Sequence, residues 1–99
     1  MSRKRIFEPV VYVMMKADTK NHDDDVEFKI SYGFELENVN PVFKVQMVQG
    51  NLLKGRQAPS YNDVDFDKIV KIRELLREEF EGLDKRLRDI KSDIDPNSI

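Results

Sequence analysis

A chain of 99 residues in which 17 basic and 19 acidic side chains nearly cancel, to a formal net charge of −2, lacks the strong single-signed field of bulk nucleic-acid binders and acidic DNA mimics. It contains no Cys, which excludes disulfides, thiol nucleophiles and thiolate metal sites. No apolar stretch approaches the roughly 20 residues that cross a bilayer, and the stretch after the basic N-terminus has no signal-peptide cleavage site, so we expect a cytoplasmic location.

The first half of the chain predicts an antiparallel sheet over residues 6–49. Residues 6–17 are rich in β-branched and aromatic side chains and favour a strand, which a polar loop follows. Residues 26–37 alternate strictly between apolar and polar side chains, which is typical of a strand with one face on a core. Turn residues at 38–41 and a second alternation at 43–47 then predict a hairpin.

Residues 50–62 predict a connecting loop, in which Leu52 and Leu53 are candidates for a short edge strand. The expected sheet therefore has three or four strands. We predict an α+β fold in the order β-β-β-α, in which this antiparallel sheet precedes one long C-terminal amphipathic helix, within a single domain of residues 1–99.

Residues 63–94 predict the helix, and residues 95–99 a short tail. Apolar residues recur at steps of three and four, and after Phe80 their stripe narrows to the pattern of a coiled-coil seam. Such a helix would run about 48 Å at 1.5 Å per residue, so its distal half is expected to project from a small domain. Gly82, which costs about 1 kcal/mol relative to Ala inside a helix, leaves open a break into two helices.

Two patterns resemble ligand sites in outline but lack the required groups. Residues 50–57 have the glycine spacing of a phosphate-binding loop, yet Arg56 and Gln57 stand where that loop needs a lysine and a hydroxyl. His22 precedes three Asp residues whose consecutive side chains point in different directions, not toward one cation. Since His22 has no nucleophile to serve, we expect no catalytic, cofactor-binding or metal-binding residues, no cofactor and no enzymatic activity.

The narrow apolar stripe is the predicted protein-interaction site, formed by Leu83, Leu87, Ile90 and Ile94. A homodimer joined through this seam is the expected state. The expected function is that of a small interaction module, acting as an adaptor, an inhibitor or a regulator of an unidentified protein partner, without membrane contact.

Two alternatives stay open. Arg3, Lys4 and Arg5 form a basic arm that can reach phosphates, which suits a dimeric nucleic-acid-binding regulator. A phage or mobile-element product that blocks a host enzyme also fits a small chain without a visible active site.

Overall fold

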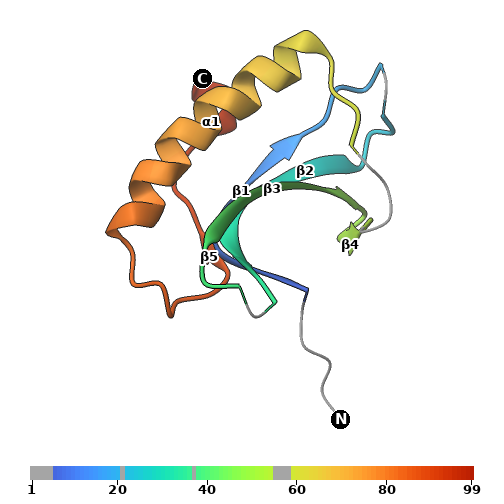
Figure 1. Cartoon of the computed structure of the whole chain (residues 1–99). Helices are drawn as coiled ribbons and strands as arrows, with labels where there is room; N and C mark the ends of the chain where they lie inside the picture. The colour runs from blue at the N-terminus through green and yellow to red at the C-terminus, as the bar shows by residue number, and fades with distance from the viewer. Residues whose placement is uncertain (1–5, 21, 37, 55–58) are drawn as a thin grey trace.

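A computed structural model of the chain describes residues 6–20, 22–36, 38–54 and 59–99. It consists of one sheet and one α-helix (Figure 1). The elements are β1 (Phe7–Lys16), β2 (Val26–Glu35), β3 (Pro41–Gln49), β4 (Leu52–Leu53), α1 (Asp63–Gly82), β5 (Ile90–Lys91) and the 3₁₀ turn η1 (Pro96–Ser98).

The sheet has the strand order β4-β3-β2-β1-β5. Neighbouring strands are antiparallel except that β5 runs parallel to β1. The predicted α+β class, with one α-helix after the main strands, is confirmed, as is the short edge strand at Leu52 and Leu53. The prediction of a purely antiparallel sheet of three or four strands is wrong, because the described sheet has five strands and is mixed.

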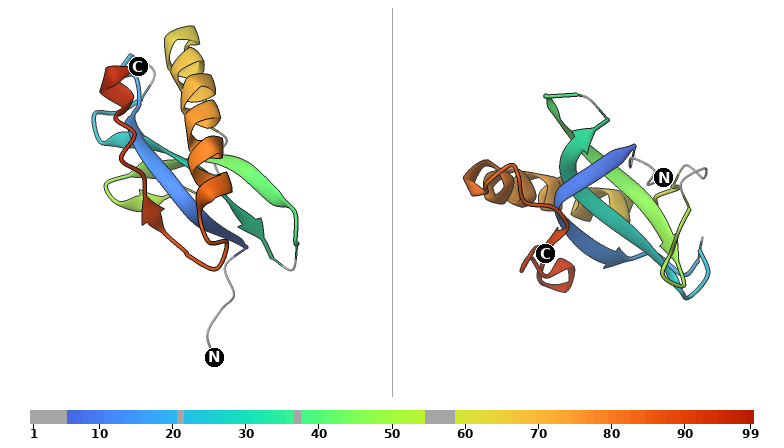
Figure 2. Two further views of the ribbon diagram at one scale, coloured as in Figure 1. Left: turned by 90° about the vertical axis from the view of Figure 1, so that its left-hand side faces the viewer. Right: turned by 90° about the horizontal axis from the view of Figure 1, so that it is seen from below.

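The alternation in β2 divides the sheet into two faces. Val26, Phe28 and Ile30 are buried on the face that α1 covers, while Glu27 and Lys29 point to the opposite face. Figure 2 shows α1 lying along one side of the sheet and the other side without a second helix. We call that second side the open face. The core therefore lies in a single layer between β1, β2 and α1.

The start of α1 is fixed by its N-cap residue. Asn62 is extended, and its side-chain oxygen accepts a hydrogen bond from the backbone N–H of Asp65 at 2.7 Å. The Asp65 carboxylate in turn accepts from the backbone N–H of Asp18 at 3.0 Å. This bond ties the first turn of the helix to the segment after β1.

The prediction of one helix over residues 63–94 is wrong beyond Gly82, where α1 ends. Leu83 is extended and donates its backbone N–H to the Phe80 carbonyl. The Lys85 ammonium donates to the carbonyls of Phe80 and Leu83, so the Phe80 carbonyl in the last turn of α1 has two partners. The coiled-coil distal half is not formed.

The chain turns back after Leu83 because the sheet offers more burial than a projecting helix. Asp89 donates its backbone N–H to the Pro9 carbonyl and Ser92 to the Tyr12 carbonyl, both at 2.8 Å, which places β5 along β1. Ile94, in what the sequence predicts as helix, packs partly buried on the core. Ile99, in the predicted tail, does so as well.

If tertiary burial ends the helix, then Gly82→Ala should leave the fold unchanged. A Cβ added at Gly82 meets nothing within 4 Å, and its φ is not in the left-handed region. We expect a change in unfolding free energy of at most about 1 kcal/mol by urea titration, in the stabilising direction. A large rise in helix content by circular dichroism would contradict this account, because it would mean that the glycine alone stops the helix.

The sheet contains one very close backbone approach. β1 has a bulge between Pro9 and Val11, and Pro9 faces Gly33 of β2. A Cβ built on Gly33 would lie 2.1 Å from the Glu8 carbonyl oxygen and 2.6 Å from the Pro9 Cα. Only glycine fits at this position.

No helix among the described residues combines the length and the apolar character that crossing a membrane requires.

Candidate functional site

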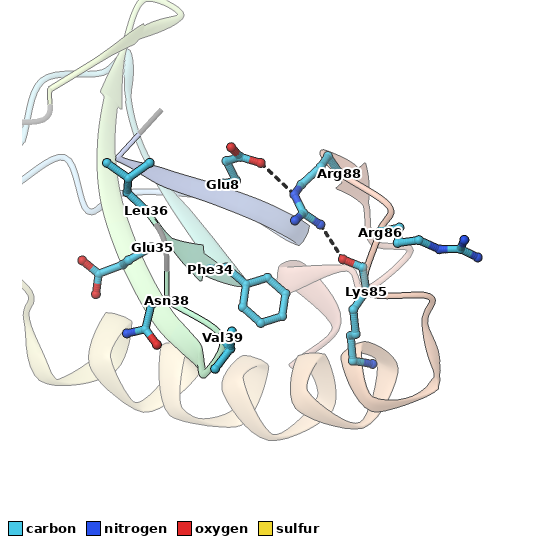
Figure 3. A pocket seen from close by; sticks show the side chains of 9 residues that line it. All are labelled: Glu8, Phe34, Glu35, Leu36, Asn38, Val39, Lys85, Arg86 and Arg88. Atoms are coloured by element: carbon cyan, nitrogen blue, oxygen red, sulfur yellow. Dashed lines mark hydrogen bonds and ion pairs between the residues drawn. The ribbon is translucent and has the colours of Figure 1, made fainter. Parts of the chain in front are cut away.

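A cleft with a volume of about 540 Å³ opens at the end of the sheet where β2 turns into β3 (Figure 3). One wall is the β2–β3 hairpin end and the other is the connection between α1 and β5. We call it the hairpin cleft. Its lining residues are Glu8, Phe34, Glu35, Leu36, Asn38, Val39, Lys85, Arg86 and Arg88.

The hairpin wall presents apolar side chains to solvent. Leu36 is 47% exposed and Val39 is 87% exposed. The backbone beside them is held in place, since Leu36 donates its N–H to the Ile6 carbonyl at 2.8 Å and Asn38 donates to the Glu35 carbonyl at 3.0 Å. These two residues are therefore an exposed apolar surface on an anchored turn.

The opposite wall is a tight turn organised by Asp84. Its carboxylate accepts from the Arg86 backbone N–H at 2.9 Å, and its carbonyl accepts from the Leu87 N–H at 3.1 Å. The Arg86 guanidinium also pairs with this carboxylate at 2.7 Å. The hydrogen bonds from Arg86, first from its side chain and then from its backbone, hold the pKa of Asp84 below its ordinary value. The carboxylate is exposed, and its hydrogen bonds shape the turn.

Arg88 joins the two walls of the cleft. Its Nε donates to the Glu8 carboxylate at 2.9 Å, and its guanidinium donates to the carbonyls of Lys85 and Leu87. The guanidinium carbon lies 5.5 Å from the centre of the Phe34 ring. Figure 3 shows Arg88 reaching from its loop toward Glu8 above the ring. The cation thus has a carboxylate, carbonyl oxygens and an aromatic face as partners.

Each basic side chain that lines the hairpin cleft is therefore already engaged. Lys85 donates to carbonyls at the end of α1, Arg86 pairs with Asp84, and Arg88 pairs with Glu8. A free anion entering the cleft would have to compete with these partners. The exposed groups left over are mainly apolar, which favours an apolar side chain from another protein over a small anionic ligand.

The open face of the sheet is a second concave surface. The Lys29 ammonium lies 4.6 Å from the centre of the Tyr12 ring, and the Lys44 ammonium lies 5.1 Å from the centre of the Phe7 ring. Between them, the hydroxyl of Ser31 is fully buried and has no hydrogen-bond partner among the described residues. Because a lysine lies across each of these two rings, neither ring offers a bare face on which a base could stack.

A smaller hollow of about 320 Å³ continues this face, lined by Tyr12, Met14, Lys29, Val48, Asn51 and Leu53. It lies beside the β3–β4 turn, where Gly50 and Asn51 have φ values of 57° and 68°. These are the left-handed conformations that a two-residue hairpin turn requires. The first glycine of the phosphate-loop-like pattern thus belongs to a hairpin turn, and its residues Gly55, Arg56 and Gln57 lie outside the described residues.

The predicted interaction residues do not come together as a helical seam. Leu83, Ile90 and Ile94 pack partly buried against the core cluster, each from a different segment. Leu87 is 40% exposed and lies between Arg86 and Arg88, which line the hairpin cleft, but does not line the cleft itself. Their role in binding a partner stays a prediction. Arg3, Lys4 and Arg5 lie outside the described residues.

Side chains of the polar loop before β2 make contacts with other parts of the fold. The Nε2 of His22 lies 2.7 Å from the Ser60 carbonyl, and its ring meets the edge of Phe28. Gln49 donates its side-chain amide to Asp23 at 3.1 Å and to Asp25 at 3.0 Å. In the described part of the chain, no three His, Cys, Asp or Glu side chains form a group that could hold a metal ion.

Sequence reasoning missed the hairpin cleft. Val39 stands in a segment that the sequence marks as a turn, and a valine at such a position is an available clue. The pairing of Arg88 with Glu8 spans 80 positions and has no local signature. No protein-family model matches this chain, and no curated protein or solved structure is significantly similar to it.

Proposed function

We propose that this chain is a small, non-enzymatic interaction module of the cytoplasm, which acts as an adaptor, an inhibitor or a regulator by binding another protein at the hairpin cleft. One observation carries the proposal: the cleft combines the exposed side chains of Leu36 and Val39 with basic groups that already have partners. Such a surface suits an apolar anchor residue with a polar rim around it.

The composition of the cleft also supports a non-enzymatic role. Its carboxylates are Glu8, which is paired with Arg88, and Glu35. No Ser, Thr, His or Tyr side chain lines it, so it brings together no nucleophile and base. The nucleic-acid alternative rests on Arg3, Lys4 and Arg5, and no contact of the described residues favours it.

Self-association stays a prediction of the sequence. Its expected basis, a projecting helical seam, does not form, so a homodimer would need a different surface. We therefore place the partner at the hairpin cleft as a different protein.

Val39→Asp tests the proposal. Because Val39 is 87% exposed, a charge there should leave the fold intact while it places an uncompensated carboxylate in the apolar part of the cleft. We expect quantitative affinity capture from the native cell to lose at least about 90% of the specific partner, which corresponds to a loss of about 1.4 kcal/mol in binding.

Val64→Asp is the matched control. Val64 is 65% exposed and lies in the first turn of α1, at the opposite end of the helix from the cleft. It should retain the partner. If both variants capture the same proteins as the unmodified chain, the cleft is not the binding surface. If the unmodified chain captures nothing beyond a tag-only control, the proposed function is wrong.

A further inference from the structure

Among the described residues, no strand pairs with the outer edge of the first part of β3. The β2–β3 register, together with the hydrogen bond from the Ala17 N–H to the Val26 carbonyl, directs the backbone groups of Lys44 and Gln46 toward β2. Those of Phe43 and Val45 therefore point away from it. On this outer side the described residues supply only β4, which pairs with Val48 and Gln49.

Lys54 closes the other end of this stretch, since its N–H donates to the Met47 carbonyl at 2.8 Å. The open edge is thus confined to the first part of β3, residues 42–46. Figure 2 shows this part of β3 extending away from α1. Two N–H and two C=O groups, those of Phe43 and Val45, are placed to bond an added strand.

A basic side chain lies on this stretch of β3, and two more lie on α1. Lys44 lies on the open face. On the other face, Arg73 and Arg77 are exposed residues of α1 that directly follow the buried Ile72 and Leu76. Each residue of a helix is turned by about 100° from the one before it, so both arginines lie on one flank of α1. The exposed Glu81, which directly follows the buried Phe80, lies on the same flank.

The hydrogen bond of Ser92 to Glu79 shows which flank this is. Glu79 directly precedes the buried Phe80, so it lies on the flank opposite to the arginines. Its carboxylate accepts from the Ser92 hydroxyl at 2.6 Å, and Ser92 directly follows β5. In the strand order, β5 is at one edge of the sheet and β3 lies toward the other edge. The arginine flank of α1 therefore faces the edge near β3. No ion pair is formed by Lys44, Arg73 or Arg77 with another described residue.

A second copy of this chain fits the edge poorly. A twofold axis perpendicular to the sheet gives antiparallel pairing, and the outward groups of Phe43 and Val45 allow few registers. If the twofold axis passes beside Lys44, the two copies of Lys44 lie directly opposite each other and repel. Centring on Phe43 pairs Val45 with Pro41, which has no N–H. Centring on Val45 needs Met47, whose carbonyl Lys54 already occupies.

We propose that the open edge of β3 binds an extended, acidic segment of a partner protein by β-strand addition. The backbone groups of Phe43 and Val45 bond the segment, and Lys44 faces an acidic side chain on it. On the helix side Arg73 and Arg77 outnumber Glu81, so the charge preference there is weaker. This inference rests on the proposed function, because it names the chemistry of the partner protein, but it concerns a separate surface.

The test uses the isotope-labelled full chain and a synthetic peptide of about eight residues, a usual strand length, in which Glu and Val alternate. In an NMR titration the amide signals of Phe43 and Val45 should shift most. A peptide with Lys in place of Glu should bind roughly tenfold more weakly, since a favourable cross-strand charge pair becomes a repulsive one. A Glu peptide with N-methylated amides on its pairing edge should not bind.

Lys44→Glu provides the matching change on the protein. It should reverse the preference, so that the Lys peptide binds more tightly than the Glu peptide. Lys71→Glu, an exposed residue of α1, makes the same change in net charge away from β3 and should keep the original preference. Circular dichroism of both variants checks that the fold is retained.

Several results would overturn the inference. These are equal binding of both peptides, equal effects of Lys44→Glu and Lys71→Glu, or the absence of shifts at Phe43 and Val45. A doubled molar mass of the chain without peptide, with Phe43 and Val45 amide signals that shift as the protein concentration rises, would identify a second copy as the occupant. The affinity-capture comparison with Val39→Asp does not depend on β3. The proposal for the hairpin cleft and the proposal for the edge of β3 can therefore be contradicted independently.

Discussion

Gly33→Ala should strongly destabilise the fold. The added methyl group would stand 2.1 Å from the Glu8 carbonyl oxygen and 2.6 Å from the Pro9 Cα. Both atoms belong to the backbone of the neighbouring strand, so no side-chain rotation can relieve the overlap. Relief requires β1 and β2 to separate at the bulge, and we expect a loss of about 3 kcal/mol or more. A domain of this size has only about 5–15 kcal/mol in total.

Urea unfolding followed by circular dichroism measures this loss. Gly82→Ala is the control, because the same methyl group meets nothing within 4 Å there. We expect the urea midpoint of the Gly82 variant to equal or slightly exceed that of the unmodified chain, and the midpoint of the Gly33 variant to be much lower. A Gly33 variant with an unchanged midpoint would show that β1 does not approach β2 this closely at the bulge.

Phe80→Ala should cost about 3–5 kcal/mol, the usual range for removing a buried aromatic side chain. Phe80 is buried at the last turn of α1, where its ring stacks on Tyr32 with centroids 5.5 Å apart and meets Phe34 at 6.1 Å. The Lys85 ammonium lies 4.4 Å from its centre. Its removal leaves a cavity where the helix, the sheet and the wall of the hairpin cleft meet.

Phe66→Ala is the matched control on the same helix, since Phe66 is 51% exposed. We expect that variant to lose no more than about 1 kcal/mol, because most surface substitutions lie near 0.5 kcal/mol. Both values come from urea titrations of the two variants. Equal losses would mean that Phe80 is not the residue that fastens the end of α1 to the sheet.

Local sequence patterns were sufficient for the larger elements of the fold. The alternation in β2 identified the strand and its buried face, and Phe28 and Ile30 are fully buried as that pattern requires. The predicted start of the helix at residue 63 is also where α1 begins. These features depend on residues close together in the chain.

The end of α1 was not predictable by the same means. Leu83, Leu87, Ile90 and Ile94 keep the spacing of three and four, so local periodicity extends the helix through them. What decides against it is the backbone of β1, which accepts the N–H groups of Asp89 and Ser92. Tertiary burial overrode the helical pattern, and no local pattern records the approach of a strand so distant in the sequence.

The hairpin cleft was beyond prediction for a similar reason. It brings together Glu8, residues 34–36 and 38–39 from the hairpin end, and residues 85, 86 and 88 from the loop after α1. Leu87 was identified as an interaction residue on the assumption of a helix, but it stands beside the cleft in a loop. Only the folded arrangement shows which of the exposed apolar residues lie together.

The parallel strand β5 has a consequence for the order of events during synthesis. β1 forms an antiparallel pair with β2 early, yet its other edge is covered by Ile90 and Lys91, about 80 positions later in the chain. At a translation rate of about 5–20 residues per second, that edge stays uncovered for several seconds while the rest of the sheet can already form. An uncovered strand edge is a site for misassembly, so a nascent or truncated chain that lacks β5 should be more prone to aggregate than its buried core alone suggests.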